Sequence, residues 1–513
     1  MLIAGHVINL SGGTLTNSGA ISPGGSSNIF TSAINGDLIQ TASGKLAIDV
    51  DLVGHTSDKV LVSGSASLAG TVVVTLNTLK KGPQSFTIVS AANGASNNGL
   101  NLVSSPALRA SLVYPANGTD VVLTTDLNFV PLPPGPVVSQ PGIAPPVAPP
   151  PAGLNSNQLA IAQGLQSSFL AGSGGVSPVL VGLIHTIGDT AYQNALHQLS
   201  PEIYSQGLIE TLYGSQQFSN DMMSCRIAGE DGAAFIREGQ CVWARARARF
   251  LDVDHTNSNI GAKDTTGSFS GGAQFALAPD WRLGVAAGYD RISLSTGAAA
   301  SSSGDRANAG AVIKYNSGPI LLAAGVTAGW GSYDTTRTMS FGGFNAQATS
   351  SNDIGYVAGQ LHAAYLLNQG NWYLKPLVDA SVTDVDLHGF HEHGGGAALK
   401  VPSRSDTVVS VSPALEIGTE LRFDSLAVLR PFIRAGVTWQ DSDSFALSAS
   451  FADAPQGVSP FSVSTKFDRV LADVSAGVDV INTGGAVMRL QYDGRFGQDT
   501  QQNSVSLKGS VPF

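Results

Sequence analysis

The sequence predicts an all-β protein whose second half is a transmembrane β-barrel of twelve antiparallel strands. The chain is apolar, with a mean hydropathy of +0.13 and only 12% charged residues. It nevertheless has no run of about 18 apolar residues that could form a membrane helix. Short segments in the second half alternate apolar with polar residues, which is the weak signature of membrane-spanning strands. The last of these segments ends on a free aromatic residue, Phe513.

Residues 1–128 predict a right-handed parallel β-helix stem. Gly, Ser, Thr and Asn separate short runs of Val, Ile and Leu, and three stretches look like loosely repeated rungs: 15–25, 34–40 and 60–66. Alternating runs at a spacing of about 20 residues suit this fold, because each coil buries its apolar face by stacking on the next. A β-sandwich is the alternative that the pattern leaves open.

A proline-rich linker is expected over residues 129–154, followed by a helical segment over 155–239. Residues 131–151 hold ten of the chain's 25 prolines. Proline at this density favours an extended polyproline II spacer, so a domain boundary is expected here. Apolar residues recur at helical spacing from Leu159 onward.

Within this segment, a long helix is predicted from residue 201 to 224. Ser200 suits the N-cap, Pro201 the first helical position and Glu202 the positive end of the helix. The helix would be about 35 Å long, which is enough to cross a barrel. Because polar residues lie all round it, we expect it inside the lumen. The alternative is a helix that packs outside against the N-terminal domain.

Residues 240–513 contain the twelve expected strands. The segments are 241–253, 265–278, 281–294, 305–316, 319–334, 352–368, 372–388, 406–423, 427–441, 468–481, 486–497 and 503–513. Short turns alternate with longer loops, of which the longest runs from 442 to 466. This asymmetry is typical of outer-membrane barrels, and an even strand number puts Phe513 on the short-turn, periplasmic side.

The strands carry charge on one face and apolar side chains on the other. An arginine that faces hydrocarbon costs about 2–4 kcal/mol near the membrane midplane, so the charged faces are expected to line a wet or plugged lumen. The residues assigned to the lumen are Arg245, Arg247, Arg249, Glu416, Glu420, Arg430, Arg434, Arg489, Asp493 and Arg495. Glu202 and Glu210 of the predicted helix are expected to pair with some of the lumen arginines.

The order of these features resembles the autotransporter (type V secretion) family. Residues 17–25 (NSGAISPGG) and 35–40 (NGDLIQ) are similar to passenger repeats, and residues 195–204 (ALHQLSPEIY) are similar to the segment before the barrel. The resemblance implies that an N-terminal passenger is exported through the barrel, which then anchors it at the cell surface. It also implies that the last strand is read by the barrel-assembly machinery, with periplasmic chaperones as further partners. The signal residues would be Phe513, Val511, Leu507 and Val505.

The resemblance implies an outer-membrane translocator that has no catalytic turnover. Its passenger is expected to be a virulence-type adhesin with a host-surface ligand, and residues 86–123 would form the passenger's terminal folding segment. An outer-membrane porin is one alternative, and the export unit of a secreted enzyme whose catalytic part precedes residue 1 is another. No signal peptide is visible at the N-terminus, so the chain is expected to be a fragment.

Other functional sites are not expected. The chain has no P-loop, HExxH or GxSxG motif, and no cofactor is predicted. His388, His391 and His393 are interpreted as loop residues rather than metal ligands. The net charge of −10, without a basic stripe, argues against nucleic acid as a partner.

Two residue pairs near the end of the predicted helix need an interpretation. Asn220 and Asp221 are interpreted as polar pore-facing residues rather than as a site of self-cleavage. Cys225 and Cys241 would lie near the periplasmic mouth, and the oxidising periplasm favours a disulfide between them. Such a bond would contribute about 3 kcal/mol. The alternative is two unpaired small residues.

Overall fold

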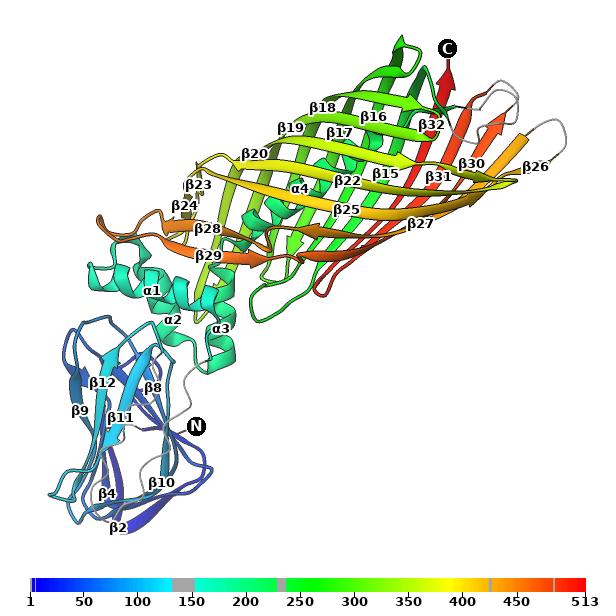
Figure 1. The fold of residues 1–513 in the computed structure, drawn as a ribbon. Coiled ribbons are helices and arrows are strands. Elements are labelled where there is room, and N and C mark those ends of the chain that lie inside the picture. Colours follow the sequence, from blue (N-terminus) through cyan, green and yellow to red (C-terminus); the bar gives the residue numbers. More distant parts are fainter. Residues whose placement is uncertain (1, 5, 132–152, 228–236, 424–426, 483–484) are drawn as a thin grey trace.

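The computed structural model describes residues 2–4, 6–131, 153–227, 237–423, 427–482 and 485–513. An N-terminal solenoid, a group of three helices and a β-barrel follow one another along an elongated molecule, and a fourth helix lies in the barrel (Figure 1). Most of the expected proline-rich segment 131–151 lies outside the described residues.

The N-terminal solenoid consists of parallel strands that stack coil on coil. Its strands are β1 (Leu2–Ala4), β2 (Val7–Asn17), β3 (Ala20–Pro23), β4 (Thr31–Gln40), β5 (Lys45–Asp51), β7 (Lys59–Val62), β8 (Ala66–Leu76), β9 (Gln84–Ala91) and β10 (Ala95–Val103), with the short β6 (Thr56–Ser57) antiparallel to β5. Leu15 pairs with Leu38 of the next coil, and Leu38 pairs with Ala66. Leu38 and Ala66 are buried. The predicted stacking of apolar faces is therefore confirmed.

Each coil is longer than the sequence spacing suggested. One turn carries the chain from Leu38 to Ala66 rather than over about 20 residues, because β4 pairs with β7 and also with β8. The last turn changes direction, since β12 (Asp120–Leu127) lies antiparallel to both β9 and β11 (Leu108–Val113). This antiparallel end closes the stack of coils.

Three helices join the solenoid to the barrel. They are α1 (Ser156–Leu170), α2 (Ser177–His185) and α3 (Asp189–Gln198), with a 3-10 turn, η1 (Gly174–Val176), before α2. The Tyr192 hydroxyl donates to the Phe129 carbonyl at 2.6 Å, and the Ser105 hydroxyl donates to the Leu183 carbonyl at 2.6 Å. One hydrophobic core continues from the solenoid through these helices into the nearer mouth of the barrel. We call this mouth the helix-side mouth.

Local sequence signals begin two of the helices. At α1, the Asn155 side chain accepts from the Gln158 N–H and the Gln158 side chain accepts from the Asn155 N–H. Helix α4 (Glu202–Met222) begins one residue after the predicted start, so its N-cap is Pro201 rather than Ser200 as predicted. The Ser200 hydroxyl still accepts from the Glu202 N–H, at 3.3 Å. Among the described helices, no single one is long and apolar enough to cross a membrane, and α1 passes that test only together with η1–α2, at a bend of 116°.

Twelve long strands form the barrel and confirm the predicted number. They are β15 (Cys241–Val253), β16 (Ala262–Ala278), β17 (Trp281–Thr296), β18 (Ala300–Ser317), β19 (Ile320–Phe341), β20 (Phe344–Tyr365), β22 (Trp372–Leu387), β25 (Arg404–Thr419), β27 (Ala427–Gln440), β30 (Val470–Asn482), β31 (Val487–Phe496) and β32 (Thr500–Pro512). The first strand closes on the last in antiparallel register, with Val242 opposite Val511. The shorter strands at the far end are β13 (Arg226–Ile227), β14 (Arg237–Glu238), β21 (Leu367–Gln369) and β26 (Leu421–Phe423).

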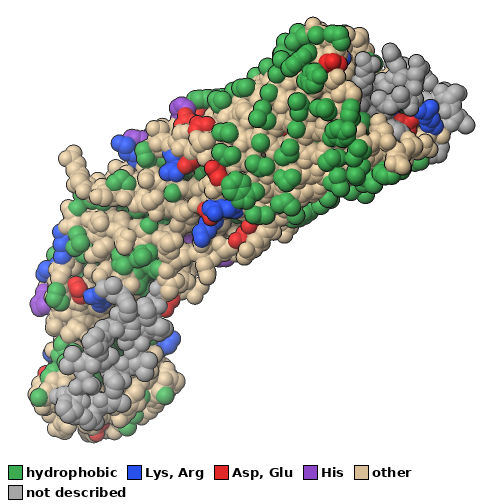
Figure 2. Space-filling view, in the orientation of Figure 1, with side chains coloured by type: hydrophobic (Ala, Val, Ile, Leu, Met, Phe, Trp, Pro, Cys, Tyr) green, Lys and Arg blue, Asp and Glu red, His purple; other side chains and the backbone are tan. Residues whose placement is uncertain are grey.

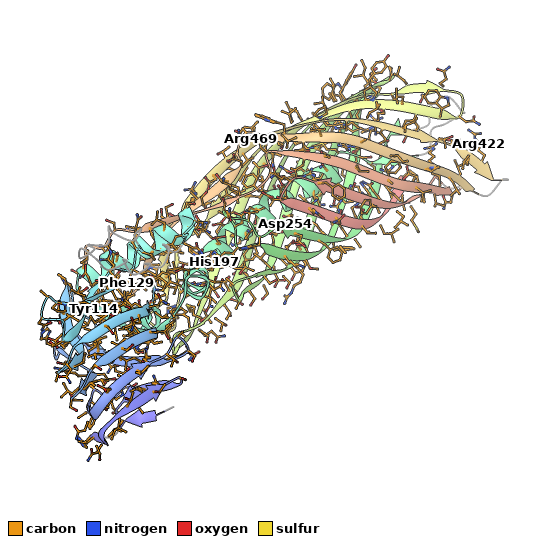
Figure 3. All side chains as sticks on the ribbon, turned by 90° about the horizontal axis from the view of Figure 1, so that it is seen from below. Tyr114, Phe129, His197, Asp254, Arg422 and Arg469 are labelled. Atoms are coloured by element: carbon orange, nitrogen blue, oxygen red, sulfur yellow. A yellow bond between two sulfur atoms is a disulfide. The ribbon has the colours of Figure 1, made fainter. Side chains whose placement is uncertain are left out.

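The outer face of the barrel is apolar. Along β15 the side chains alternate, so that Val242 and Phe250 are exposed while Arg245 and Arg249 are buried. Hydrophobic side chains are spread over the visible barrel surface (Figure 2). Figure 3 shows Arg422 at the barrel end that is remote from the solenoid. An apolar outer face with charges inside is what a strand-built membrane span requires.

Two segments that were predicted as loops contain strands. The sequence predicted a loop over 335–351, but β19 and β20 continue through it. Polar residues predominate there because these strand ends extend past the apolar belt. The predicted loop 442–466 contains β28 (Ser444–Phe451) and β29 (Phe461–Lys466), which form a four-stranded sheet with β23 (Phe390–His391) and β24 (Leu399–Val401). Helix α1 packs on this sheet, where Phe461 lies against Gly164.

Candidate functional site: the barrel lumen and its central helix

Helix α4 lies inside the barrel (Figure 1). All 21 of its residues except Asn220 are buried, although many of them are polar. The buried polar residues of the helix are Glu202, Ser205, Gln206, Glu210, Thr211, Ser215, Gln216, Gln217, Ser219 and Asp221. Burying charged groups is costly unless they are paired, so the barrel wall has to supply partners for them.

The first set of partners surrounds Glu210, near the middle of α4. Both terminal nitrogens of Arg306 donate to its carboxylate, at 2.9 and 3.1 Å, and Arg249 also pairs with it. Each arginine also pairs with a second carboxylate: a terminal nitrogen of Arg249 lies 3.2 Å from a carboxylate oxygen of Asp264, and one of Arg306 lies 2.8 Å from a carboxylate oxygen of Asp290. All five side chains are buried. This group, which we call the Glu210 clamp, fixes the helix to β15 and β18.

A second set of partners surrounds Asp221 at the end of α4. Its carboxylate pairs with Arg245 and, at 2.7 Å, with Arg247. Lys508 of β32 donates to the backbone carbonyls of Asp221 and Ser224, at 3.1 and 2.6 Å. A cation at a helix C-terminus satisfies carbonyls that have no partner within the helix. We call this group the Asp221 clamp.

Three glycines of neighbouring strands make room for apolar side chains at the same end. Added Cβ atoms at Gly288, Gly310 and Gly325 would lie 2.9, 2.8 and 2.9 Å from Phe218, Met222 and Met223, respectively. These side chains cluster with Trp243, Cys225 and Cys241. The structure joins the two cysteines by a disulfide, with their Cα atoms 6.3 Å apart. These side chains therefore form an apolar plug that fills part of the lumen at the C-terminal end of α4.

At the helix-side mouth, Glu392 joins α4, which carries Tyr204, to β19, which carries Arg337. Two nitrogens of Arg337 donate hydrogen bonds to the Glu392 carboxylate, at 2.7 and 2.6 Å. The Tyr204 hydroxyl donates to the same carboxylate at 2.5 Å. This group was not predicted, because Arg337 and Glu392 both lay in predicted loops. His391 and His393 flank Glu392 in sequence, and no group of three or more His, Cys, Asp or Glu side chains in the described ranges could hold a metal.

Glu202 pairs with no arginine in the described part of the chain, which corrects the expectation for this residue. It lies at the helix-side mouth, where it accepts from Asn157 at 3.0 Å and from the Ile260 N–H at 2.8 Å. Asn157 also exchanges two hydrogen bonds with the backbone of Ser464, each at 2.9 Å. Neutral donors therefore hold Glu202, and they tie α1, α4 and the rim together.

The residues that the sequence assigned to the lumen lie on the inner faces of their strands: Arg245, Arg247, Arg249, Glu416, Glu420, Arg430, Arg434, Arg489, Asp493 and Arg495. Most of these pair along the wall rather than with α4. Arg430 is 2.9 Å from Glu420, and Arg434 is 3.5 Å from Asp379. A cleft of about 210 Å³ separates this part of the wall from α4, and Asn220 lines it.

The residues assigned to the assembly signal lie on the outer face of β32 and at its end. Val505, Leu507, Val511 and Phe513 are each about half exposed or more, and the Phe513 ring lies 5.7 Å from that of Phe275.

Comparisons with known proteins agree with this geometry. Residues 242–493 match the sequence model of the family described as Autotransporter beta-domain. An extracellular serine protease of Serratia marcescens is 26% identical over 325 residues, which cover 61% of this chain and 30% of that protein. Esterase EstA of Pseudomonas aeruginosa is 26% identical over 276 residues, which cover 51% of this chain and 41% of that protein. The chain thus spans less than half the length of either relative.

Solved structures with a similar fold include two autotransporter domains. The translocator domain of NalP from Neisseria meningitidis has a TM-score of 0.48 at 14% identity and covers 61% of this chain and all of that domain. The β-domain of the Bordetella autotransporter BrkA has a TM-score of 0.39 at 15% identity and covers 54% of this chain and all of that domain. Residues 242–493 thus form an autotransporter β-domain, a barrel that lies in the outer membrane.

Proposed function

We propose that this chain exports its own N-terminal part through the barrel and then anchors it at the cell surface. The observation that carries the proposal is α4, which is buried on all sides within a closed barrel. Its N-terminal end connects to the solenoid at the helix-side mouth, and its C-terminal end leads into β15. A segment placed in this way is the last part of the exported chain, and it stays in the pore when export ends.

The proposed division of labour follows the architecture. Residues 1–128 form the passenger stem, 129–154 a linker, 155–239 the helical segment with the pore helix, and 240–513 the translocator. The antiparallel end of the solenoid supports the interpretation of 86–123 as a terminal folding segment, since it closes the stack of coils.

We propose that the passenger acts as an adhesin with a host-surface ligand. Solenoids present extended binding surfaces, and this one exposes mainly small polar side chains. A passenger that carries an enzyme is the second candidate, because relatives are named as a serine protease and an esterase. The translocator itself has no catalytic turnover. A diffusion porin is disfavoured, since α4 and its two clamps occupy the lumen.

Two further roles belong to the ends of the translocator. We propose that Phe513, with the outward residues of β32, is the signal for the barrel-assembly machinery and for periplasmic chaperones. The Cys225–Cys241 disulfide would hold the end of α4 to the first strand, since both cysteines are buried in the apolar plug.

Epitope tags test the topology directly. A tag inserted after Gly118, in the turn between β11 and β12, should be labelled by antibody on intact cells. The matched control is a tag after Gly318, in the turn between β18 and β19. Both glycines have a positive φ and open space around them. The control tag should be labelled only after the outer membrane is permeabilised. Labelling of the Gly118 tag only after permeabilisation would refute export of the solenoid.

A further inference from the structure

A groove crosses the outer face of the barrel where the first and last strands meet. It is a depression of about 530 Å³ that is largely open to the outside. Its floor is made of small residues, namely Ala246 and Ala248 of β15 and Gly267 of β16. Its walls are large apolar side chains that are about half exposed or more: Phe269, Tyr289, Leu490, Val505 and Leu507. The groove therefore has an apolar lining that suits a hydrocarbon chain.

The protein itself gives no packing reason for the small floor. A Cβ added at Gly267 would meet no atom within 4 Å, in contrast to the glycines that receive α4. Gly267 lies inside a regular strand, opposite Ala248 and Arg291. Glycine weakens a strand interior and often marks a place where a ligand approaches the backbone closely. The space above Gly267 is therefore open to a ligand that approaches from outside the barrel.

Taking the exposed Trp281, the first residue of β17, as the inner edge of the apolar band places the upper end of the groove at the level of lipid headgroups. Between Trp281 and Tyr289, β17 rises roughly 20 Å along the membrane normal, at about 3.4 Å per residue and a tilt of about 40°. The apolar band of such barrels is about 25 Å tall. Tyr289 is therefore placed near the outer edge of the band, and Arg291 lies one step beyond it toward the cell exterior.

Arg291 supplies a cation at this end. Its side chain is 69% exposed, and Nη1 alone contacts Asp305, at 2.8 Å. The Tyr289 hydroxyl donates to the same carboxylate at 2.7 Å. These contacts hold the guanidinium beside the groove while most of its surface faces outward. A guanidinium in this position presents several donors to a phosphate.

We propose that this groove binds an acyl chain of the phosphorylated glycolipid that forms the outer leaflet, lipopolysaccharide. The chain lies along Ala246, Ala248 and Gly267, and a phosphate of the headgroup meets Arg291. The groove opens directly onto the lipid-facing belt, so its occupant comes from the membrane in which the barrel lies. The site also places a bound lipid over the seam between β15 and β32, where it would cover the closure of the barrel.

Retention of lipid by the purified full chain tests the proposal. The chain is extracted from outer membranes in mild detergent, and bound lipopolysaccharide and phosphatidylethanolamine are quantified by mass spectrometry. Gly267→Leu fills the groove and should lower retained lipopolysaccharide about tenfold, the equivalent of about 1.4 kcal/mol. Arg291→Ala should lower it less, because the acyl contacts remain.

The matched control is Gly359→Leu. Gly359 is also an outward strand glycine with no atom within 4 Å of an added Cβ, but it lies on β20, away from the groove. It should retain lipid as the wild type does. Equal loss in both leucine variants, or retention of phosphatidylethanolamine alone, would overturn the proposal. So would reduced membrane insertion of Gly267→Leu with unchanged lipid retention, which would indicate a contact with the assembly machinery instead.

A second measurement uses the wild-type chain, so it does not depend on the folding of a variant. Lipopolysaccharide with a photoactivatable acyl chain is incorporated into vesicles that contain the protein. Cross-links should concentrate on the peptides that contain Ala246–Ala248 and Gly267. Uniform labelling around the barrel would overturn the proposal.

Discussion

Replacing Glu210 by glutamine removes the negative charge that holds both Arg249 and Arg306 to the central helix. In the wild type all three side chains are buried, and Arg306 makes a two-point contact with the carboxylate. Breaking a buried ion pair costs about 3–5 kcal/mol, because the remaining charge is left without compensation. Asp264 and Asp290 still serve the two arginines after the change, so we expect the lower end of this range.

A loss of about 3 kcal/mol raises the fraction of undocked helix by roughly a hundredfold. The assay is ion conductance of the purified full chain in planar bilayers. The wild type should be closed for most of the recording, and Glu210→Gln should show frequent openings. Deleting residues 201–220 supplies the reference conductance of the emptied barrel.

The control is Ser205→Ala, which changes another buried residue of α4, and the hydroxyl of Ser205 has no hydrogen-bond partner among the described residues. It should leave the recording as in the wild type. The reasoning is refuted if Glu210→Gln folds, inserts and stays as closed as Ser205→Ala. An unchanged conductance in the deletion would place the helix outside the pore.

Four further outcomes are expected. Deleting Phe513 should leave the barrel uninserted and degraded, because β32 would lose its terminal aromatic; normal levels of the protein in outer-membrane fractions would contradict this. Ala246→Arg should insert less well than Arg245→Leu, since it turns a charge toward lipid at about 2–4 kcal/mol, whereas Arg247 still pairs with Asp221 when Arg245 is lost; equal insertion would show that the assigned faces of β15 are wrong. Cys241→Ser should lower the free energy of unfolding by about 3 kcal/mol, and a heat-modifiability assay that shows no shift would count against a stabilising disulfide. Burial raises the pKa of Asp58 to about 7, so its contribution to solenoid stability is present at low pH and is lost as the pH rises toward and through 7. Asp58→Asn should therefore flatten the dependence of unfolding on pH between about 4 and 7, whatever its absolute stability, and an unchanged slope would contradict this assignment.

Much of the fold followed from local pattern. Strict alternation along residues 241–250 was enough to place the arginines on one face and the apolar side chains on the other, because a strand has a period of two. The turn residues between strands gave the number and order of the barrel strands. The start of the central helix was predicted to within one residue, although its N-cap is Pro201 and not Ser200.

The alternating pattern did not predict the strand segments that lie outside the apolar belt. The extensions of β19 and β20 face water on the outside, so no apolar residue is needed at every second position. Arg337 of β19 consequently fell in a predicted loop. Glu392, just after the short strand β23, also lay in a predicted loop, and the structure joins the two residues by two hydrogen bonds. The length of the solenoid coil was also underestimated, because one long strand, β4, pairs with both β7 and β8 of the next turn.

The sequence by itself determined which strand faces meet lipid and which carry charge, because that choice depends on a two-residue period and on the cost of placing arginine in hydrocarbon. The tertiary structure alone decided which charges meet. Glu210 and Arg306 are far apart along the chain, and their contact depends on the depth and rotation of α4 in the lumen. Neither quantity is encoded in a local pattern, since both follow from the packing of a whole helix against several strands at once.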